Sequence, residues 1–125
     1  MQDSIIFPLK GQSYNIAFPT VGQYRDIQIA KQNLSMNNYG GLFRSMLTES
    51  EDALDMIDIE ANLSILCPEL IKVLKVPFSE LGLLDYIEIR KVYREVFEPW
   101  WSEIMKILRP QPLNAKVEVN GDKES

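Results

Sequence analysis

The stretch Ser4–Phe18, "SIIFPLKGQSYNIAF", decides the fold class because it carries the clearest strand signal in the chain. Two short runs rich in Ile, Phe and Tyr flank Gly11, and in the second run Tyr14, Ile16 and Phe18 alternate with polar or small residues. This is the period of a strand with one buried face, and two such runs around a glycine-containing turn predict a β-hairpin. An isolated hairpin is only marginally stable in water, so its apolar face has to pack on the rest of the chain.

Helical periodicity follows the hairpin. Thr20 and Gln23 have the spacing of a capping box, which predicts a helix that begins near Val21. A second box at Thr48–Glu51 opens the acidic segment "ESEDALDMIDIEANLSILCP", whose apolar residues recur at three and four residue steps. Pro68 ends this helix or starts the next turn, because proline cannot donate the hydrogen bond that a helix interior needs.

Two more helical segments are expected toward the C-terminus. The segment "PELIKVLK" predicts a short helix before Pro77, and a capping-box pattern at Asp85–Glu88 opens a longer one. Pro99 marks a break, after which Trp100–Leu108 forms a separate short helix or the kinked continuation of the preceding one. We therefore expect an α+β fold, mostly α, in which the N-terminal β-hairpin packs on a bundle of about four to five short helices.

The domain organisation follows from length and from a change of composition. A chain of 125 residues fits one domain, which buries about two thirds of the surface of its unfolded chain. From Arg109 onward, "RPQPLNAKVEVNGDKES" contains two prolines and no sustained apolar period. We expect a single α-rich domain with its N-terminal hairpin at residues 1–110 and a flexible polar tail at residues 111–125.

The charge balance argues against several classes of partner. The chain has 18 acidic and 13 basic residues and a formal net charge of −5, whereas nucleic acids and anionic membranes attract basic surfaces. It also lacks the run of about 18 or more apolar residues that a membrane-spanning helix needs. We expect no nucleic acid partner and no membrane association, and we interpret Cys67, the only cysteine, as a small core residue.

Catalytic patterns are scarce. The chain has no histidine, which removes the usual base for serine and cysteine nucleophiles and the usual Cys/His zinc sites. The acidic run contains Glu51, Asp55 and Asp58 on one helix face, where carboxylate oxygens could hold Mg²⁺. A solvated helix face is the stronger interpretation, because acidic residues near a helix N-terminus complement its dipole. We expect no enzyme, no cofactor and no metal.

Trp100 and Trp101 are adjacent in the sequence, and they are the only two tryptophans of the chain. Adjacent residues of a helix point about 100° apart, so the two side chains cannot share one face. Trp100 begins an apolar row with Ile104, Ile107 and Leu108, which assigns it to the core. Trp101 then lies at the rim of the core or anchors a partner, since tryptophan is enriched at binding hot spots.

A second candidate for a contact surface is the segment "YGGLFRSML", with its aromatic and methionine side chains. Methionine surfaces adapt to varied partners, because the side chain is unbranched and polarisable. The alternative is that these side chains belong to the core. The candidate partner-binding residues are Trp101, Met105, Tyr93, Tyr39, Leu42, Phe43, Met46 and Leu47.

The order of segments over residues 1–108 resembles the tail assembly chaperones of long-tailed bacteriophages. The resemblance is carried by the hairpin and by "FPTVGQYRDIQIAKQ", "SEDALDMIDIEANLSILCPEL", "VPFSELGLLDYIEIRKVY" and "VFEPWWSEIMKIL". It implies a non-catalytic protein that coats the hydrophobic helical tape measure protein and helps to recruit tail tube protein in the cytoplasm of a bacterial host. The alternative is a structural or adaptor subunit of a phage virion or of another assembly. A third interpretation is an enzyme that uses the acidic run to bind a metal. The sequence also leaves open whether the protein forms a homo-oligomer.

Overall fold

The structure, a computed structural model, describes residues 2–110. Strands β1 (Ser4–Leu9) and β2 (Gln12–Ala17) form the expected antiparallel hairpin, with Ile5 opposite Ile16. The two-residue turn between them has positive φ at both positions, 50° at Lys10 and 79° at Gly11. Turns of this kind match the right-handed twist of the flanking strands, and glycine adopts a positive φ without steric cost.

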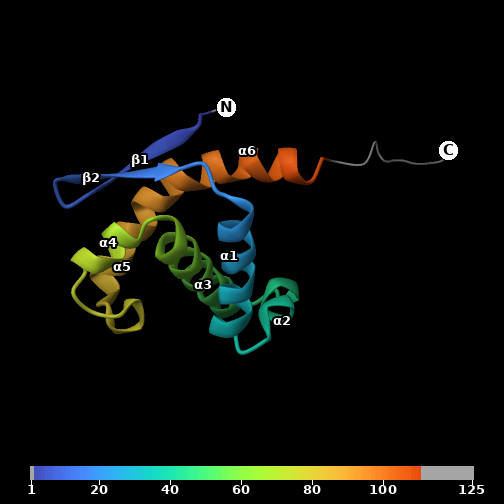
Figure 1. The fold of residues 1–125 in the computed structure, drawn as a ribbon. Coiled ribbons are helices and arrows are strands. Elements are labelled where there is room, and N and C mark those ends of the chain that lie inside the picture. Colours follow the sequence, from blue (N-terminus) through green and yellow to red (C-terminus); the bar gives the residue numbers. More distant parts are fainter. Residues whose placement is uncertain (1, 111–125) are drawn as a thin grey trace.

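Helices make up most of the remainder of the described chain, which confirms the α+β, mostly α fold class (Figure 1). A 3-10 turn at Phe78–Glu80 precedes α5, and a π-helical segment at Tyr93–Phe97 joins α5 to α6. The tail expected at 111–125 lies outside the described residues. The α-helices are α1 (Val21–Leu34), α2 (Tyr39–Arg44), α3 (Thr48–Leu66), α4 (Pro68–Val73), α5 (Leu83–Val92) and α6 (Glu98–Leu108).

The N-terminal end of α1 has the predicted capping box. The Thr20 hydroxyl accepts a hydrogen bond from the backbone N–H of Gln23 at 3.0 Å, and the Gln23 side-chain oxygen accepts one from the Thr20 N–H at 2.9 Å. Both groups therefore satisfy amide donors that have no partner inside the helix.

The other two predicted capping boxes are wrong. Helix α3 begins at Thr48 with Leu47 at the cap position, and α5 begins at Leu83 with Gly82 at the cap position. Neither cap makes a side-chain hydrogen bond. Just upstream, the Ser45 hydroxyl accepts a hydrogen bond from the Leu47 N–H at 3.2 Å, which orders the turn before α3 but does not cap the helix.

Pro99 does not separate two helices. The backbone passes from α5 through the π-helical segment into α6, so the continuation is the correct alternative. In a regular α-helix the ring of Pro99 would collide with the carbonyl of Glu95, four residues earlier. A wider π turn immediately before the proline relieves this collision and keeps the chain helical.

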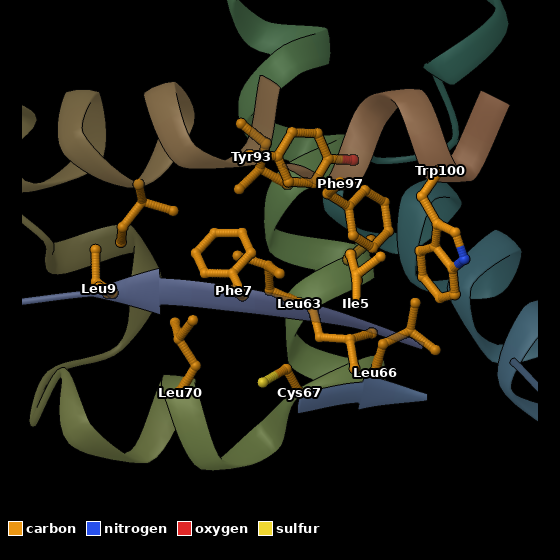
Figure 2. Packing of buried hydrophobic residues seen from close by; sticks show 14 of the residues in the cluster. Ile5, Phe7, Leu9, Leu63, Leu66, Cys67, Leu70, Tyr93, Phe97 and Trp100 are labelled. Carbon is orange, nitrogen blue, oxygen red and sulfur yellow. The ribbon is translucent and has the colours of Figure 1, made fainter. Parts of the chain in front are cut away.

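The core lies between the hairpin, α3, α4 and the continuous α5–α6 helix (Figure 2). Helices α1 and α2 pack on α3, while β1 packs on α5 and the π-helical segment. Phe7 of β1 and Phe97 of the π-helical segment are both fully buried, as is Cys67 at the junction of α3 and α4. The hairpin is thus stabilised by the helices, as its instability in isolation requires.

Trp100 belongs to this core, as predicted. Its side chain is 3% exposed, and its indole N–H donates to the backbone carbonyl of Gln2 at 2.9 Å. Ile104 is also buried, but Ile107 and Leu108 are exposed, so the predicted apolar row is wrong over its second half. Figure 1 shows why: the last turns of α6 extend beyond the hairpin that covers its first turns.

Over the described residues, no helix combines the length and apolar character needed to cross a membrane.

Candidate functional site

A stacked column of aromatic rings leads from the core to the surface. The rings of Tyr93 and Phe97 lie 4.6 Å apart between centroids, those of Phe97 and Trp101 5.3 Å, and those of Trp101 and Tyr24 of α1 6.3 Å. All three pairs are stacked with interplanar angles of 18° to 23°. The four-residue spacing of Tyr93, Phe97 and Trp101 puts their side chains in line along the helix.

Tyr93 is at the buried end of the column, which corrects its assignment to the partner-binding surface. Its side chain is 4% exposed, and its hydroxyl accepts a hydrogen bond from the Asn62 side-chain amide at 2.8 Å. Burial is the main reason that the pKa of Tyr93 is raised, so the hydroxyl stays neutral. Tyr93 supports the surface from within the core and cannot contact a partner.

Trp101 and Met105 of α6 line a hollow of about 410 Å³ together with Tyr39 and Phe43 of α2. We call it the aromatic hollow; Tyr24 of α1 completes its aromatic lining. Four of the predicted partner-binding residues thus converge on one feature, although they come from segments far apart in the sequence. Helix α1 stands between these segments and holds Tyr24 against Trp101.

The chain from α2 to α3 presents apolar side chains to solvent. Phe43 is 72% exposed, Met46 93% and Leu47 64%, whereas Leu42 and Tyr39 are partly buried. The core alternative for the three exposed residues is therefore wrong. Phe43 lies on α2, which packs on α3, and Met46 and Leu47 follow the extended backbone at Ser45. We call Phe43, Met46 and Leu47 the apolar edge.

Tyr39 is fixed by a polar contact beneath the aromatic hollow. Its hydroxyl donates to the Asp58 carboxylate at 2.7 Å, and the Lys31 ammonium lies 3.7 Å from Asp58 and 5.4 Å from the Tyr39 ring centroid. Burial raises the pKa of Asp58, and the favourable contacts with Lys31 and Tyr39 oppose this shift. Asp58 and Lys31 together hold the Tyr39 ring in place between α1 and α3.

Two carboxylates of the acidic run on α3 contact other elements. Asp55 forms an ion pair with Arg94 of the π-helical segment, and Asp58 contacts Lys31 of α1. These partners lie 27 to 39 residues away in sequence, so periodicity within the helix could not reveal them. Across residues 2–110 no group of three or more Cys, Asp or Glu side chains has the arrangement of a metal site.

Sequence reasoning missed the basic residues around the aromatic hollow. Lys31, Arg44 and Arg109 all line it, and the Arg109 guanidinium donates to the Tyr24 hydroxyl at 2.8 Å. Arg109 directly follows α6, at the start of the polar composition that leads into the expected tail. Only the packing of α6 against α1 brings it to the hollow.

No protein-family model, curated protein or solved structure matches the chain. A functional assignment therefore rests on the surface itself. That surface combines an exposed apolar edge, an aromatic hollow and flanking charges.

Proposed function

We propose that the protein is a non-catalytic tail assembly chaperone of a long-tailed bacteriophage. It binds the hydrophobic helical tape measure protein in the cytoplasm of the bacterial host and assists assembly of the tail tube protein around it. The observation that carries this proposal is the apolar edge beside the aromatic hollow. Exposed apolar side chains that are grouped together are typical of an interaction site, whereas single exposed ones are common on any protein surface.

A helical client suits the apolar composition of this surface. An amphipathic helix binds a groove through apolar side chains that recur at three and four residue steps. A tape measure protein presents many such stripes with different sequences along its length. Met46 and Met105 favour binding to varied stripes, because their unbranched side chains adapt to different shapes.

The wall of the hollow is ordered before any client binds. Trp101 stacks on Phe97 and Tyr24, and Tyr39 is held by Asp58. Side chains that are already fixed lose little conformational entropy on binding, which favours affinity. The side chains of the apolar edge are mostly exposed to water in the absence of a client.

Co-expression with the tape measure protein of the same phage tests this function. We expect the chaperone to keep the tape measure protein soluble and to co-purify with it. The double variant Phe43→Ser/Met46→Ser should lose this effect, because it removes the two most exposed side chains of the apolar edge. The control Leu83→Ser/Leu84→Ser removes comparably exposed side chains from α5 and should retain it.

Mass spectrometry of the purified mature particle provides the second test. A chaperone leaves before the tail is complete, so we expect no peptides of this protein in the particle. Peptides at the abundance of tail components would identify a structural or adaptor subunit instead. Unchanged client binding by Phe43→Ser/Met46→Ser would show that the apolar edge is not the binding site.

A further inference from the structure

The aromatic hollow is a locally basic site on an acidic protein. Its lining includes Lys31, Arg44 and Arg109 and no acidic residue, although the chain as a whole has a net charge of −5. Lys31 is already paired with Asp58. Among residues 2–110, neither Arg44 nor Arg109 lies within ion-pair distance of a carboxylate. Two guanidinium groups are thus available to a ligand at the rim.

A hydrogen bond holds Arg109 at the hollow, and Arg44 lines the hollow from α2. The bond from Arg109 to the Tyr24 hydroxyl uses one of its N–H donors and leaves others for an anionic group. The Arg44 guanidinium lies back along α2 over Gly40, so close that a Cβ atom on Gly40 would lie 3.2 Å from one of its nitrogens. Glycine at this position lets the guanidinium lie against the helix beside the hollow.

The opposite side of the same surface is acidic. Tyr39 and Phe43 also line a second hollow of about 320 Å³, whose charged lining consists of Glu51, Asp55 and Asp58 and one basic residue, Arg94. Asp55 and Asp58 have basic partners, whereas Glu51 has no ion-pair partner among the described residues. Tyr39 and Phe43 therefore form an aromatic ridge with positive charge on one side and negative charge on the other.

We propose that this surface recognises an amphipathic helix with one acidic and one basic flank. Its apolar stripe lies along the aromatic ridge, its acidic flank faces Arg44 and Arg109, and its basic flank faces Glu51. The inference rests on the proposed function, because it specifies the chemistry of the helical client. Complementary charges at the rim determine which partner is accepted, since like charges brought together there weaken binding.

Local and overall charge make opposite predictions, which makes the inference testable. The net charge of −5 attracts a helix with two basic flanks most strongly. The charge pattern around the ridge favours a helix with mixed flanks, because a basic flank would be repelled by Arg44 and Arg109. The order of affinities for helices that differ only in their flanks distinguishes the two effects.

The probes are designed peptides of about 20 residues, a length at which isolated helices form in water. They share one stripe of leucine and methionine and carry mixed, doubly basic or doubly acidic flanks. Calorimetric titration of the full chain should give a dissociation constant about tenfold lower for the mixed peptide than for either other peptide, the size expected when several rim charges change sign. Raising the salt concentration should reduce this preference.

Charge reversal in the protein provides the reciprocal test. Arg44→Glu/Arg109→Glu should transfer the preference to the doubly basic peptide. Lys72→Glu/Lys91→Glu makes the same change in net charge at exposed positions of α4 and α5, outside the lining of either hollow. This control should preserve the preference of the unmodified protein for the mixed peptide.

Each other outcome overturns a defined part of the argument. Equal affinities, or tightest binding of the doubly basic peptide by the unmodified protein, would refute the charge recognition and leave the chaperone proposal intact. Failure of all three peptides to bind would refute both the charge recognition and the proposal that this surface binds a helical client. If a chain ending at Pro110 binds every peptide about tenfold more tightly, residues 111–125 occupy the hollow and the client assignment is wrong. Binding of a labelled oligothymidine that Arg44→Glu/Arg109→Glu abolishes would assign the site to nucleic acid.

Discussion

Trp101 stacks on Phe97 with 5.3 Å between ring centroids, while its neighbour Trp100 meets the same phenyl ring edge-on at 5.9 Å. One buried ring thus contacts both tryptophans in different geometries. The indole of Trp100 donates a hydrogen bond to the backbone carbonyl of Gln2. The indole of Trp101 stacks on Tyr24 and lines the aromatic hollow. Of the two adjacent tryptophans, Trp100 therefore fills the core and Trp101 forms part of the surface.

Trp100→Ala should strongly destabilise the protein. The indole is 3% exposed and packs against Phe18 and Phe97, so its removal leaves a large cavity between the hairpin and α6. Truncation of a buried tryptophan costs about 3–5 kcal/mol. Denaturation with urea should show the loss as a lower midpoint, and a midpoint near that of the unmodified protein would contradict the core assignment.

Trp101→Ala should cost about 1–3 kcal/mol, because the variant loses two aromatic stacking contacts but leaves a site that is open to water. This loss of stability is larger than for a surface residue without stacking contacts and smaller than for Trp100→Ala. The same urea denaturation measures it. If both variants lose equal stability, the two tryptophans do not differ in their contribution to the core.

Local signals in the sequence were sufficient where neighbouring residues determine the structure. The alternation around Ile16 predicted the hairpin, and Thr20 with Gln23 predicted the start of α1, because each pattern acts within a few residues. The same reasoning failed for the starts of α3 and α5. There the chain enters the helix from an extended residue, Leu47 or Gly82, without a side-chain cap.

Contacts between distant elements could not be read from the sequence. A helical period indicates which residues share a face but not how far the neighbouring element extends, so Leu108 was wrongly assigned to the core. Tyr93 was wrongly placed on the surface, because its partner Asn62 lies on another helix. The basic side of the aromatic hollow depends on Arg109 reaching Tyr24, a contact across 85 residues.

Tyr93→Phe should destabilise the protein by about 1–3 kcal/mol, because it leaves the Asn62 side-chain amide buried without a partner. The Asn62 carbonyl oxygen already has no hydrogen-bond partner in the structure. Replacing both residues, as in Asn62→Leu/Tyr93→Phe, should recover most of the loss, because no polar group is then stranded. A double-mutant cycle by chemical denaturation measures the coupling, and purely additive effects would argue against the bond.

Asp58→Asn should change the dependence of stability on pH. Burial raises the pKa of Asp58 above its usual value of 3.8, so the folded state binds this proton more tightly than the unfolded chain does. The contribution of Asp58 to stability is therefore greatest below that value and is lost as the pH rises through the raised pKa. The free energy of unfolding of the unmodified protein relative to Asp58→Asn should fall across this range and then level off. A difference that rises with pH would show that Lys31 and Tyr39 outweigh burial.

Gly40→Ala and Gly41→Ala form a matched pair within the first turn of α2. At Gly40 a new Cβ atom would meet only the end of the flexible Arg44 side chain, at 3.2 Å. Because alanine favours helix, Gly40→Ala should stabilise the protein by about 0.5–1 kcal/mol. At Gly41 the Cβ atom would overlap with the side-chain oxygen of Asn38, which has to move away, and this cost offsets the gain. Thermal melts of the two variants should therefore give a higher midpoint for Gly40→Ala than for Gly41→Ala, and the reverse order would show that the packing of Arg44 over Gly40 is essential to α2.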